Sequence, residues 1–347
     1  MELTREYADF AAKKALELLS IDSPTGFTAK AIAWCKKEFE NLGCECRVTN
    51  KGALCVTVGG EDNKNGLLME VHTDTLGAMI SEIKGSGCLK LTNLGGLKPA
   101  NVETENVRVY TRDGRVYEGT VQLHNPSGHV NGAFDSTVRS WDTVEVVLDE
   151  NVKSAADVRA LGIENGDFVC MEPRAHITES GYIKSRFLDD KLSVGIFMAL
   201  VKFIRDNNVN LNRRLYGMVT VYEEVGHGGA ANIPADVTEV LSVDMGCVGD
   251  GLMCTEREVS ICAKDSGGPY DYTVTDKLVK AARREGAAYA IDTYPMYGSD
   301  AEVTLRAGND VRHGCLGSGV FASHGYERSH VDGVFNTLKT LKGYLEI

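Results

Sequence analysis

Several common signatures are absent from this 347-residue sequence, and each absence excludes a class of protein. There is no apolar run of about 18 residues, so the sequence predicts no membrane span. The glycine-rich phosphate-binding loop, the G-x-S-x-G nucleophile motif and the H-E-x-x-H zinc motif are also missing. Phosphate-loop nucleotide hydrolases, serine hydrolases with that nucleophile motif and single-zinc proteases with that zinc motif therefore lack support.

The cysteine spacing and the charge balance exclude further classes. The ten cysteines include no C-x-x-C pair, and most stand singly among apolar residues. We therefore expect reduced core residues in a cytoplasmic protein rather than disulfides or zinc ligands. The formal net charge of -12 repels phosphate backbones, so we expect no nucleic-acid partner. The charged and amphipathic start of the chain predicts no signal peptide.

The periodicity of apolar residues predicts an α/β protein with one inserted module. Residues 1–76 and 178–347 alternate strand-like runs with helical patterns, which predicts one α/β domain with a mixed sheet and helices on both faces. Residues 77–177 lack a long helical period and contain short alternating segments with glycine-rich turns. We expect residues 77–177 to form a small all-β domain.

Acidic and imidazole side chains follow several of the predicted strands. They are His72 and Asp74, Asp189 and Asp190, Glu223 and Glu224, Asp244, and one of two histidines near the C-terminus, His324 or His330. Open α/β sheets bind ligands outside the carboxyl ends of their strands, so residues remote in sequence can converge there. Two histidines and several carboxylates are typical of a divalent metal site with nitrogen and oxygen ligands.

The adjacent glutamates Glu223 and Glu224 are the most informative pair, although a solvated strand end would also explain them. Adjacent side chains point in different directions, so one glutamate can bind a cation while the other accepts a proton from a water molecule. Asp189 and Asp190 have a comparable alternative, because aspartate is favoured as the cap of a following helix.

Two choices concern the histidines. His72 alone can be a buried core residue, but a metal-binding histidine usually gives its other ring N–H to an acceptor, and Asp74 is placed to be that acceptor. For the second histidine ligand we favour His330, which directly precedes the predicted final helix, and we expect His324 to lie on the substrate side or behind the ligands.

Taken together, these segments resemble the tetrahedral, glutamyl-aminopeptidase-like family of dinuclear metallopeptidases, nearly end to end and including the β insertion. The motifs that carry the resemblance are Val71-His72-Thr73-Asp74, Phe187-Leu188-Asp189-Asp190-Lys191, Glu223-Glu224-Val225-Gly226, Val243-Asp244 and Glu327-Arg328-Ser329-His330. Gly298-Ser299-Asp300-Ala301 is similar to the family's Gly-x-Asp-Ala segment. The familiar members have Asp-Asp-Arg or Asp-Asn-Arg where this chain has Asp189-Asp190-Lys191.

The resemblance implies roles for seven of these residues. Asp189 would bridge two divalent ions, which could be zinc, cobalt or manganese. His72 and Asp244 would complete one ion's site, and Glu224 and His330 the other. Glu223 would be the general base, and Asp74 would orient His72.

The resemblance also implies an activity. We expect a cytoplasmic aminopeptidase that removes N-terminal residues from short peptides with a free N-terminus, assembled as a homo-oligomer such as a dodecamer. The inserted domain, residues 77–177, would act in oligomerisation or as a lid. The alternatives on the same fold are an N-acyl-amino-acid deacylase and a carboxypeptidase, and a requirement for a free α-amine would separate them. A non-catalytic, metal-stabilised assembly protein is the alternative from another class, and the intact Glu223 argues against it.

Overall fold

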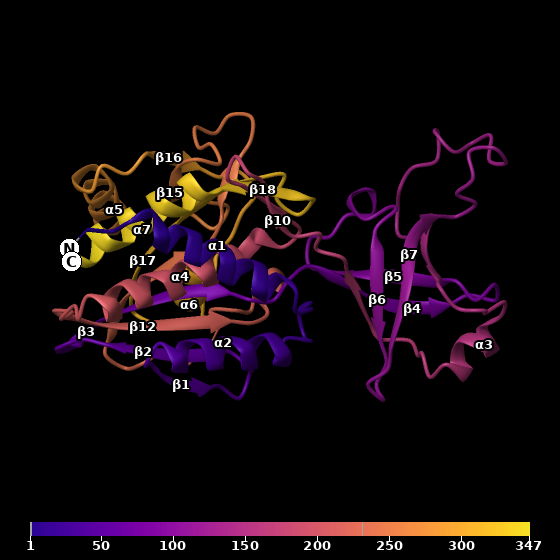
Figure 1. Cartoon of the computed structure of the whole chain (residues 1–347), viewed down its shortest axis with the longest axis horizontal. Coiled ribbons are helices and arrows are strands. Elements are labelled where there is room, and N and C mark those ends of the chain that lie inside the picture. The colour runs from indigo at the N-terminus through magenta and orange to yellow at the C-terminus, as the bar shows by residue number, and fades with distance from the viewer. Residues whose placement is uncertain (1, 231) are drawn as a thin grey trace. The chain divides into compact units, whose positions relative to one another are not determined.

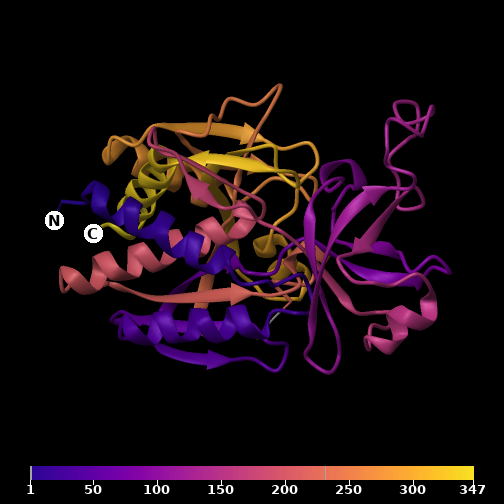
Figure 2. The ribbon, with the colours of Figure 1, turned by 45° about the vertical axis from the view of Figure 1, so that its right-hand side comes forward.

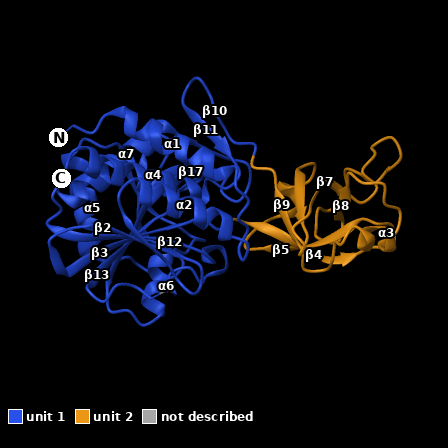
Figure 3. Cartoon of the chain, turned by 60° about the horizontal axis from the view of Figure 1, so that its bottom comes forward, with its two compact units in different colours: residues 1–74, 174–347 blue, residues 75–173 orange. Residues whose placement is uncertain are grey.

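The structure is a computed structural model that describes residues 2–230 and 232–347. The chain divides into two compact units, coloured separately in Figure 3: residues 1–74 with 174–347 form unit 1, and residues 75–173 form unit 2. Unit 2 thus begins two residues before and ends four residues before the predicted insertion 77–177. In the part of the chain that is described, no helix has the length and apolarity that crossing a bilayer requires.

Unit 1 contains all but one of the described α-helices, and a long central helix organises them. Their bounds are α1 Arg5–Leu19, α2 Ala29–Asn41, α4 Leu188–Asp206, α5 Tyr272–Arg284, α6 Asp300–Arg306 and α7 Val331–Leu345. Helix α4 is buried along most of its length and lies beside α1 in both Figure 1 and Figure 2. A Cβ atom at Gly195 would lie 2.3 Å from the Ala11 carbonyl oxygen, so only glycine permits this close approach.

The helices of unit 1 cover a mixed sheet of twelve strands. Its main path runs β1 Glu45–Val48, β2 Leu54–Gly59, β12 Arg213–Thr220, β3 Asp62–His72, β13 Val237–Val243, β17 Arg312–Phe321, β18 Glu327–His330, β11 Tyr182–Ser185 and β10 His176–Ile177. Off this path, β14 Gly246–Val248 and β15 Val259–Lys264 pair with β17, and β16 Tyr289–Thr293 pairs with β15. Figure 3 shows α1, α4 and α7 on one side of the strands and α6 on the other, as predicted.

The centre of this sheet positions the site. Strand β3 pairs in parallel with β12 on one side and with β13 on the other, and β13 pairs in parallel with β17. A strand covered on both faces is apolar throughout rather than alternating, and residues 66–72 of β3 are all buried. Parallel strands end at the same edge of a sheet. The residues that follow β3, β12 and β13 therefore lie close together at that edge.

Unit 2 is a small closed barrel. Its strands pair in the order β4 Gly77–Ile83, β5 Leu89–Leu94, β8 Val144–Leu148, β7 Val116–Leu123, β6 Asn106–Tyr110 and β9 Phe168–Met171. Alternate residues fill its interior, as in β7, where Gly119, Val121 and Leu123 are buried. One short helix, α3 Ala155–Ala160, accompanies the barrel. The structure thus confirms the predicted fold class, an α/β protein with an inserted all-β domain.

The sequence patterns missed the shortest elements. Strand β14 has three residues and β18 has four, too few for a period to emerge. The ten cysteines are all free thiols, and six of them are buried.

Candidate metal centre and active site

Three strand ends at one edge of the sheet carry most of the predicted site. His72 is the last residue of β3, Glu223 and Glu224 follow β12 by a few residues, and Asp244 directly follows β13. The turn after β12 needs Tyr222 in the left-handed region, with φ 70°. The parallel order of these strands therefore places the four side chains at a common edge of the sheet.

His72 lies at the centre of the cluster. Its Nε2 atom is 3.1 Å from Asp189 Oδ1 and 3.7 Å from Glu223 Oε2. Its Nδ1 atom is 2.9 Å from the backbone carbonyl oxygen of Asp74. The imidazole is buried, which opposes the charged form, but Glu223 and Asp189 together raise the pKa of His72 well above its ordinary value. Nδ1 donating to a carbonyl leaves Nε2 free to act as a ligand.

Asp74 contributes in a different way from the one predicted. Its backbone carbonyl, rather than its carboxylate, is the closer partner of His72, since Asp74 Oδ1 is 3.7 Å from Nδ1. The buried carboxylate instead accepts hydrogen bonds from the backbone N–H groups of Glu223 at 3.1 Å and Glu224 at 3.4 Å. Thr25 Oγ1 donates to it at 2.7 Å. Asp74 therefore holds the glutamate segment as well as the imidazole.

Asp189 and Asp190 lie at the start of α4. The turn into this helix has Phe187 in the left-handed region, with φ 66°, and both aspartates have non-helical backbone angles. Asp189 faces His72, whereas Asp190 Oδ2 accepts a hydrogen bond from the His72 backbone N–H at 3.1 Å. Lys191, which stands where familiar members of the family have arginine, is buried and donates to the Leu18 and Ile21 carbonyls. It serves to join α4 to the end of α1.

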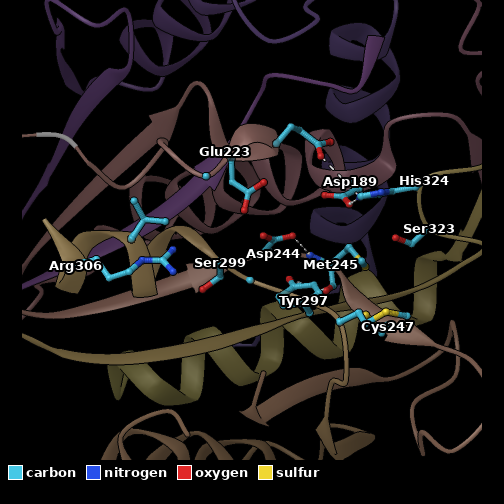
Figure 4. A pocket seen from close by; sticks show the side chains of 15 residues that line it. Asp189, Glu223, Asp244, Met245, Cys247, Tyr297, Ser299, Arg306, Ser323 and His324 are labelled. Carbon is cyan, nitrogen blue, oxygen red and sulfur yellow. Dashed lines mark hydrogen bonds and ion pairs between the residues drawn. The ribbon is translucent and has the colours of Figure 1, made fainter. Parts of the chain in front are cut away.

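The structure places His324, rather than His330, in the cluster. His324 Nε2 is 3.5 Å from Asp189 Oδ2 and 3.7 Å from Glu224 Oε2. The hydrogen bond with Asp189 raises the pKa of His324 to about 9. Figure 4 shows the His324 and Asp189 side chains next to one another at the cavity. His324 therefore takes the position for which the sequence analysis favoured His330.

His330 is occupied elsewhere, which corrects that prediction. Its Nδ1 accepts a hydrogen bond from the Asp332 backbone N–H at 2.9 Å, so the side chain caps helix α7. Its Nε2 donates to the Ser180 carbonyl oxygen at 2.8 Å. Both ring nitrogens are used by backbone groups, so neither is available as a ligand.

Glu327 is a buried residue of the site that the sequence analysis quoted only as part of a motif. Its carboxylate accepts hydrogen bonds from the backbone N–H groups of Asp189 at 3.2 Å and His324 at 3.1 Å. Burial raises the pKa of Glu327 to about 8. One carboxylate thus fixes two of the metal-ligand candidates through their backbones, and only its spacing of three residues from His324 could have hinted at this.

Burial disfavours the charged form of the carboxylates in the cluster. Burial raises the pKa of Glu223, Glu224 and Asp190 well above their ordinary values, and that of Asp244 to about 7. Buried Glu224 Oε1 and Asp190 Oδ1 have no hydrogen-bond partner among the described residues. A buried carboxylate oxygen without a partner is costly, and a bound cation would satisfy it.

The ligand atoms are spaced as a metal would require. One set, with atoms within 4.8 Å of one another, is His72, Asp190 and Asp244, and the other is His72, Asp189 and Glu224. Carboxylate and imidazole donors suit divalent zinc, cobalt or manganese. Asp190, for which we expected a capping or orienting role, thus also has a ligand position. The residues present fit a metal centre.

The cluster forms one wall of a cavity of about 340 Å³. Figure 4 shows Glu223, Asp189 and Asp244 directed into it. The opposite walls carry Met245, Cys247, Met296, Tyr297, Val303 and Arg306. This cavity can hold an amino-acid side chain beside the acids.

An α/β sheet with a cluster of carboxylates and histidines beyond its parallel strands defines a class of protein suited to binding divalent cations. Residues 52–340 match the M42 glutamyl aminopeptidase family. This chain belongs to that family.

Relatives and solved structures agree with this assignment. The chain is 40% identical over 330 residues to "Putative aminopeptidase YhfE" of Bacillus subtilis (strain 168), covering 95% of each chain. It is 26% identical over 222 residues to the glutamyl aminopeptidase of Lactococcus lactis subsp. cremoris (strain MG1363), covering 62% of this chain and 61% of that protein. The fold is similar to aminopeptidase APDkam598 of the archaeon Desulfurococcus kamchatkensis, with TM-score 0.86, 20% identity and coverage of 98% and 94%. It is also similar to PhTET1-12s, described as a dodecamer, with TM-score 0.83, 19% identity and coverage of 96% and 98%.

Proposed function

We propose that this protein is a metal-dependent aminopeptidase that removes N-terminal residues from short peptides. The observation that carries the proposal is the buried cluster of acids and histidines that opens into the cavity, with carboxylate oxygens that lack a partner among the described residues. Membership of the M42 family and the names of the relatives support the aminopeptidase activity.

Two divalent ions would be held by five residues. Asp189 would contribute to both positions, with His72 and Asp244 at one, where Asp190 is also within ligand distance, and Glu224 and His324 at the other. Ions bound there would polarise the scissile carbonyl and lower the pKa of the attacking water. Two such ions offset about four negative charges, which leaves the cavity wall near neutral.

Glu223 is the residue we assign to proton transfer. Its side chain reaches into the cavity, and Oε2 lies 3.7 Å from His72 Nε2, beside the ligands without being needed as one. Asp74 fixes its backbone N–H. Glu223 would accept the proton of the attacking water and donate it to the leaving amine.

A peptide with a free N-terminus fits this site better than a blocked one. The α-amine is accepted beside the acids Glu224 and Asp244, whereas an N-acetyl group loses that contact and adds bulk against the wall. We expect N-acetylated peptides to be cleaved at least about 10²-fold more slowly than free peptides. Comparable rates on the two would overturn the aminopeptidase assignment in favour of a deacylase or an endopeptidase.

The activity is tested by hydrolysis of aminoacyl anilides before chelation, after chelation and after divalent ions are added back. We expect activity to disappear with the metal and to return with zinc, cobalt or manganese. Hydrolysis that survives complete removal of metal would contradict the metal-dependent mechanism, and no hydrolysis in any metal state would favour a non-catalytic assembly protein.

We also propose that unit 2 mediates association of the subunits. A closed barrel is not needed to complete the sheet of unit 1. The similar PhTET1-12s chain is described as a dodecamer, and the Pyrococcus horikoshii TET1 peptidase is described as forming a tetrahedron or an octahedral shell. A homo-oligomer is therefore the expected state of this protein.

A further inference from the structure

The loop of residues 226–230 directly follows the Glu223–Glu224 pair, and a lysine from a distant part of the chain holds it. Lys51 lies in the turn between β1 and β2. Its Nζ atom contacts three backbone carbonyl oxygens: His227 at 2.5 Å, Gly228 at 2.8 Å and Ala230 at 2.9 Å. An ammonium group has three protons to donate. Lys51 thus uses its whole donor capacity on this one loop.

The same loop is held from the side of α6. The carboxylate of Asp300 accepts a hydrogen bond from the Gly229 backbone N–H at 2.6 Å. Thr304 Oγ1 lies 3.0 Å from the Gly229 carbonyl oxygen. A Cβ atom at Gly228 would lie 2.2 Å from Asp300 Oδ1, so a glycine is required for this approach. Lys51 and Asp300 therefore hold the loop through its carbonyl and N–H groups respectively.

Lys51 contacts backbone carbonyl oxygens rather than a carboxylate. Among the described residues it forms no ion pair within 4 Å, and its charge acts on Asp300, Glu70 and Asp74 only at longer range. Partial burial lowers the pKa of Lys51. Charged donors make stronger hydrogen bonds than neutral ones, so this cation stabilises a loop that its glycines would otherwise leave free.

The loop adjoins both the cavity and the turn that carries Glu223 and Glu224. Gly226 lines the cavity, and its N–H donates to the Glu223 carbonyl at 2.7 Å. The His227 N–H donates to the Tyr222 carbonyl at 2.9 Å, across the turn that carries both glutamates. A displacement of the loop would therefore move Glu223, whose carbonyl accepts the Gly226 N–H, relative to His72.

We propose that Lys51 is a positioning residue for the reaction: its ammonium group, acting against Asp300 across the loop, fixes the direction of the Glu223 carboxylate. The inference rests on the proposed function of Glu223. It does not make Lys51 a contact of the substrate or of a metal.

The first test needs no activity. Hydrogen–deuterium exchange of metal-free protein is compared between wild type, Lys51→Met and the control Lys64→Met, an exposed lysine at the start of β3. Lys51→Met keeps the length of the side chain and removes the three donors. We expect faster exchange confined to residues 223–230 in Lys51→Met and none in Lys64→Met. Unchanged exchange in residues 223–230 would overturn the proposal.

The second test separates positioning from binding. With two metal ions confirmed by elemental analysis, we expect kcat of Lys51→Met to fall about 10- to 100-fold, the scale for a misplaced catalytic group, with KM and metal affinity unchanged. Loss of metal together with activity, or kcat within twofold of wild type, would overturn the proposal.

A third variant covers a failure of Lys51→Met to fold. Lys51→Arg keeps the charge, but its larger planar group replaces the compact ammonium group that lies among three carbonyl oxygens, so we expect a folded protein with a loss of kcat in the same direction. Full kcat in Lys51→Arg would count against the inference. If the wild-type protein hydrolyses no peptide, the proposed function fails, and the exchange experiment still decides whether Lys51 holds the loop.

Discussion

The buried acids described in unit 2 and those at the site of unit 1 have different surroundings. In unit 2 the buried acids have nearby partners: Glu145 pairs with Lys84 at 2.6 Å, and Asp167 accepts the Glu164 backbone N–H at 2.9 Å. In unit 1 the acids at the strand ends lie among one another, and two of their buried oxygens have no partner among the described residues. The difference supports the proposal that a bound cation completes the site in unit 1.

Substitution of Asp189 should have the largest effect on the acid cluster of unit 1. Asp189 is the candidate bridging carboxylate, and it lies within reach of both His72 and His324. Asp189→Ala should empty both metal positions and remove nearly all hydrolysis, while unit 2 stays folded. Elemental analysis checks this directly, and two tightly held ions in the variant would refute the bridging role.

Removal of metal should destabilise unit 1 selectively. A ligand present at about 1,000 times its Kd stabilises the folded state by about 4 kcal/mol. After chelation we expect faster hydrogen exchange in β3 and β13, whose ends carry His72 and Asp244, and little change in β6 and β7 of the barrel. Equal losses of protection in the two units would show that the metal centre does not act locally.

Substitutions of His324 and His330 should have smaller effects, and the two effects should differ in kind. His324→Ala should weaken one ion by more than the roughly 10–100-fold that loss of an outer partner costs. His330→Ala should keep both ions and the activity but lower the free energy of unfolding by about 1–3 kcal/mol, because it removes a cap and leaves the Ser180 carbonyl unpaired. Metal titrations and denaturant unfolding of the two variants distinguish them, and the reverse pattern would restore His330 as the ligand.

The smallest effect concerns unit 2. Light scattering of the purified protein should report a homo-oligomer, and dilution that dissociates it should leave the metal content per chain unchanged, because the ligand candidates all belong to unit 1. A monomer at every concentration would leave unit 2 with the role of a lid.

The sequence was most informative where a strand ends. His72, Glu223, Glu224 and Asp244 could be grouped because apolar runs predict buried parallel strands, and such strands end at one edge. Apolar periodicity also predicted the sheet and the inserted β unit.

The errors concern contacts that no local pattern encodes. His324 and His330 differ only in what surrounds their rings, and the Ser180 carbonyl that occupies His330 lies 150 residues away. The Asp74 carboxylate turns to the glutamates because Thr25 and two backbone N–H groups bind it. The contacts of Lys51 with the 226–230 loop span about the same sequence distance.

The central claim is that Glu223 moves the proton in a reaction that depends on a metal held by other residues. Glu223→Gln tests it most directly, because the amide has nearly the same shape but cannot accept the proton. Metal content is measured by elemental analysis and turnover by hydrolysis of an aminoacyl anilide on the same preparation. The account predicts two ions per chain, as in wild type, with turnover about 10²- to 10⁴-fold lower. Full turnover in a variant that holds both ions would contradict it.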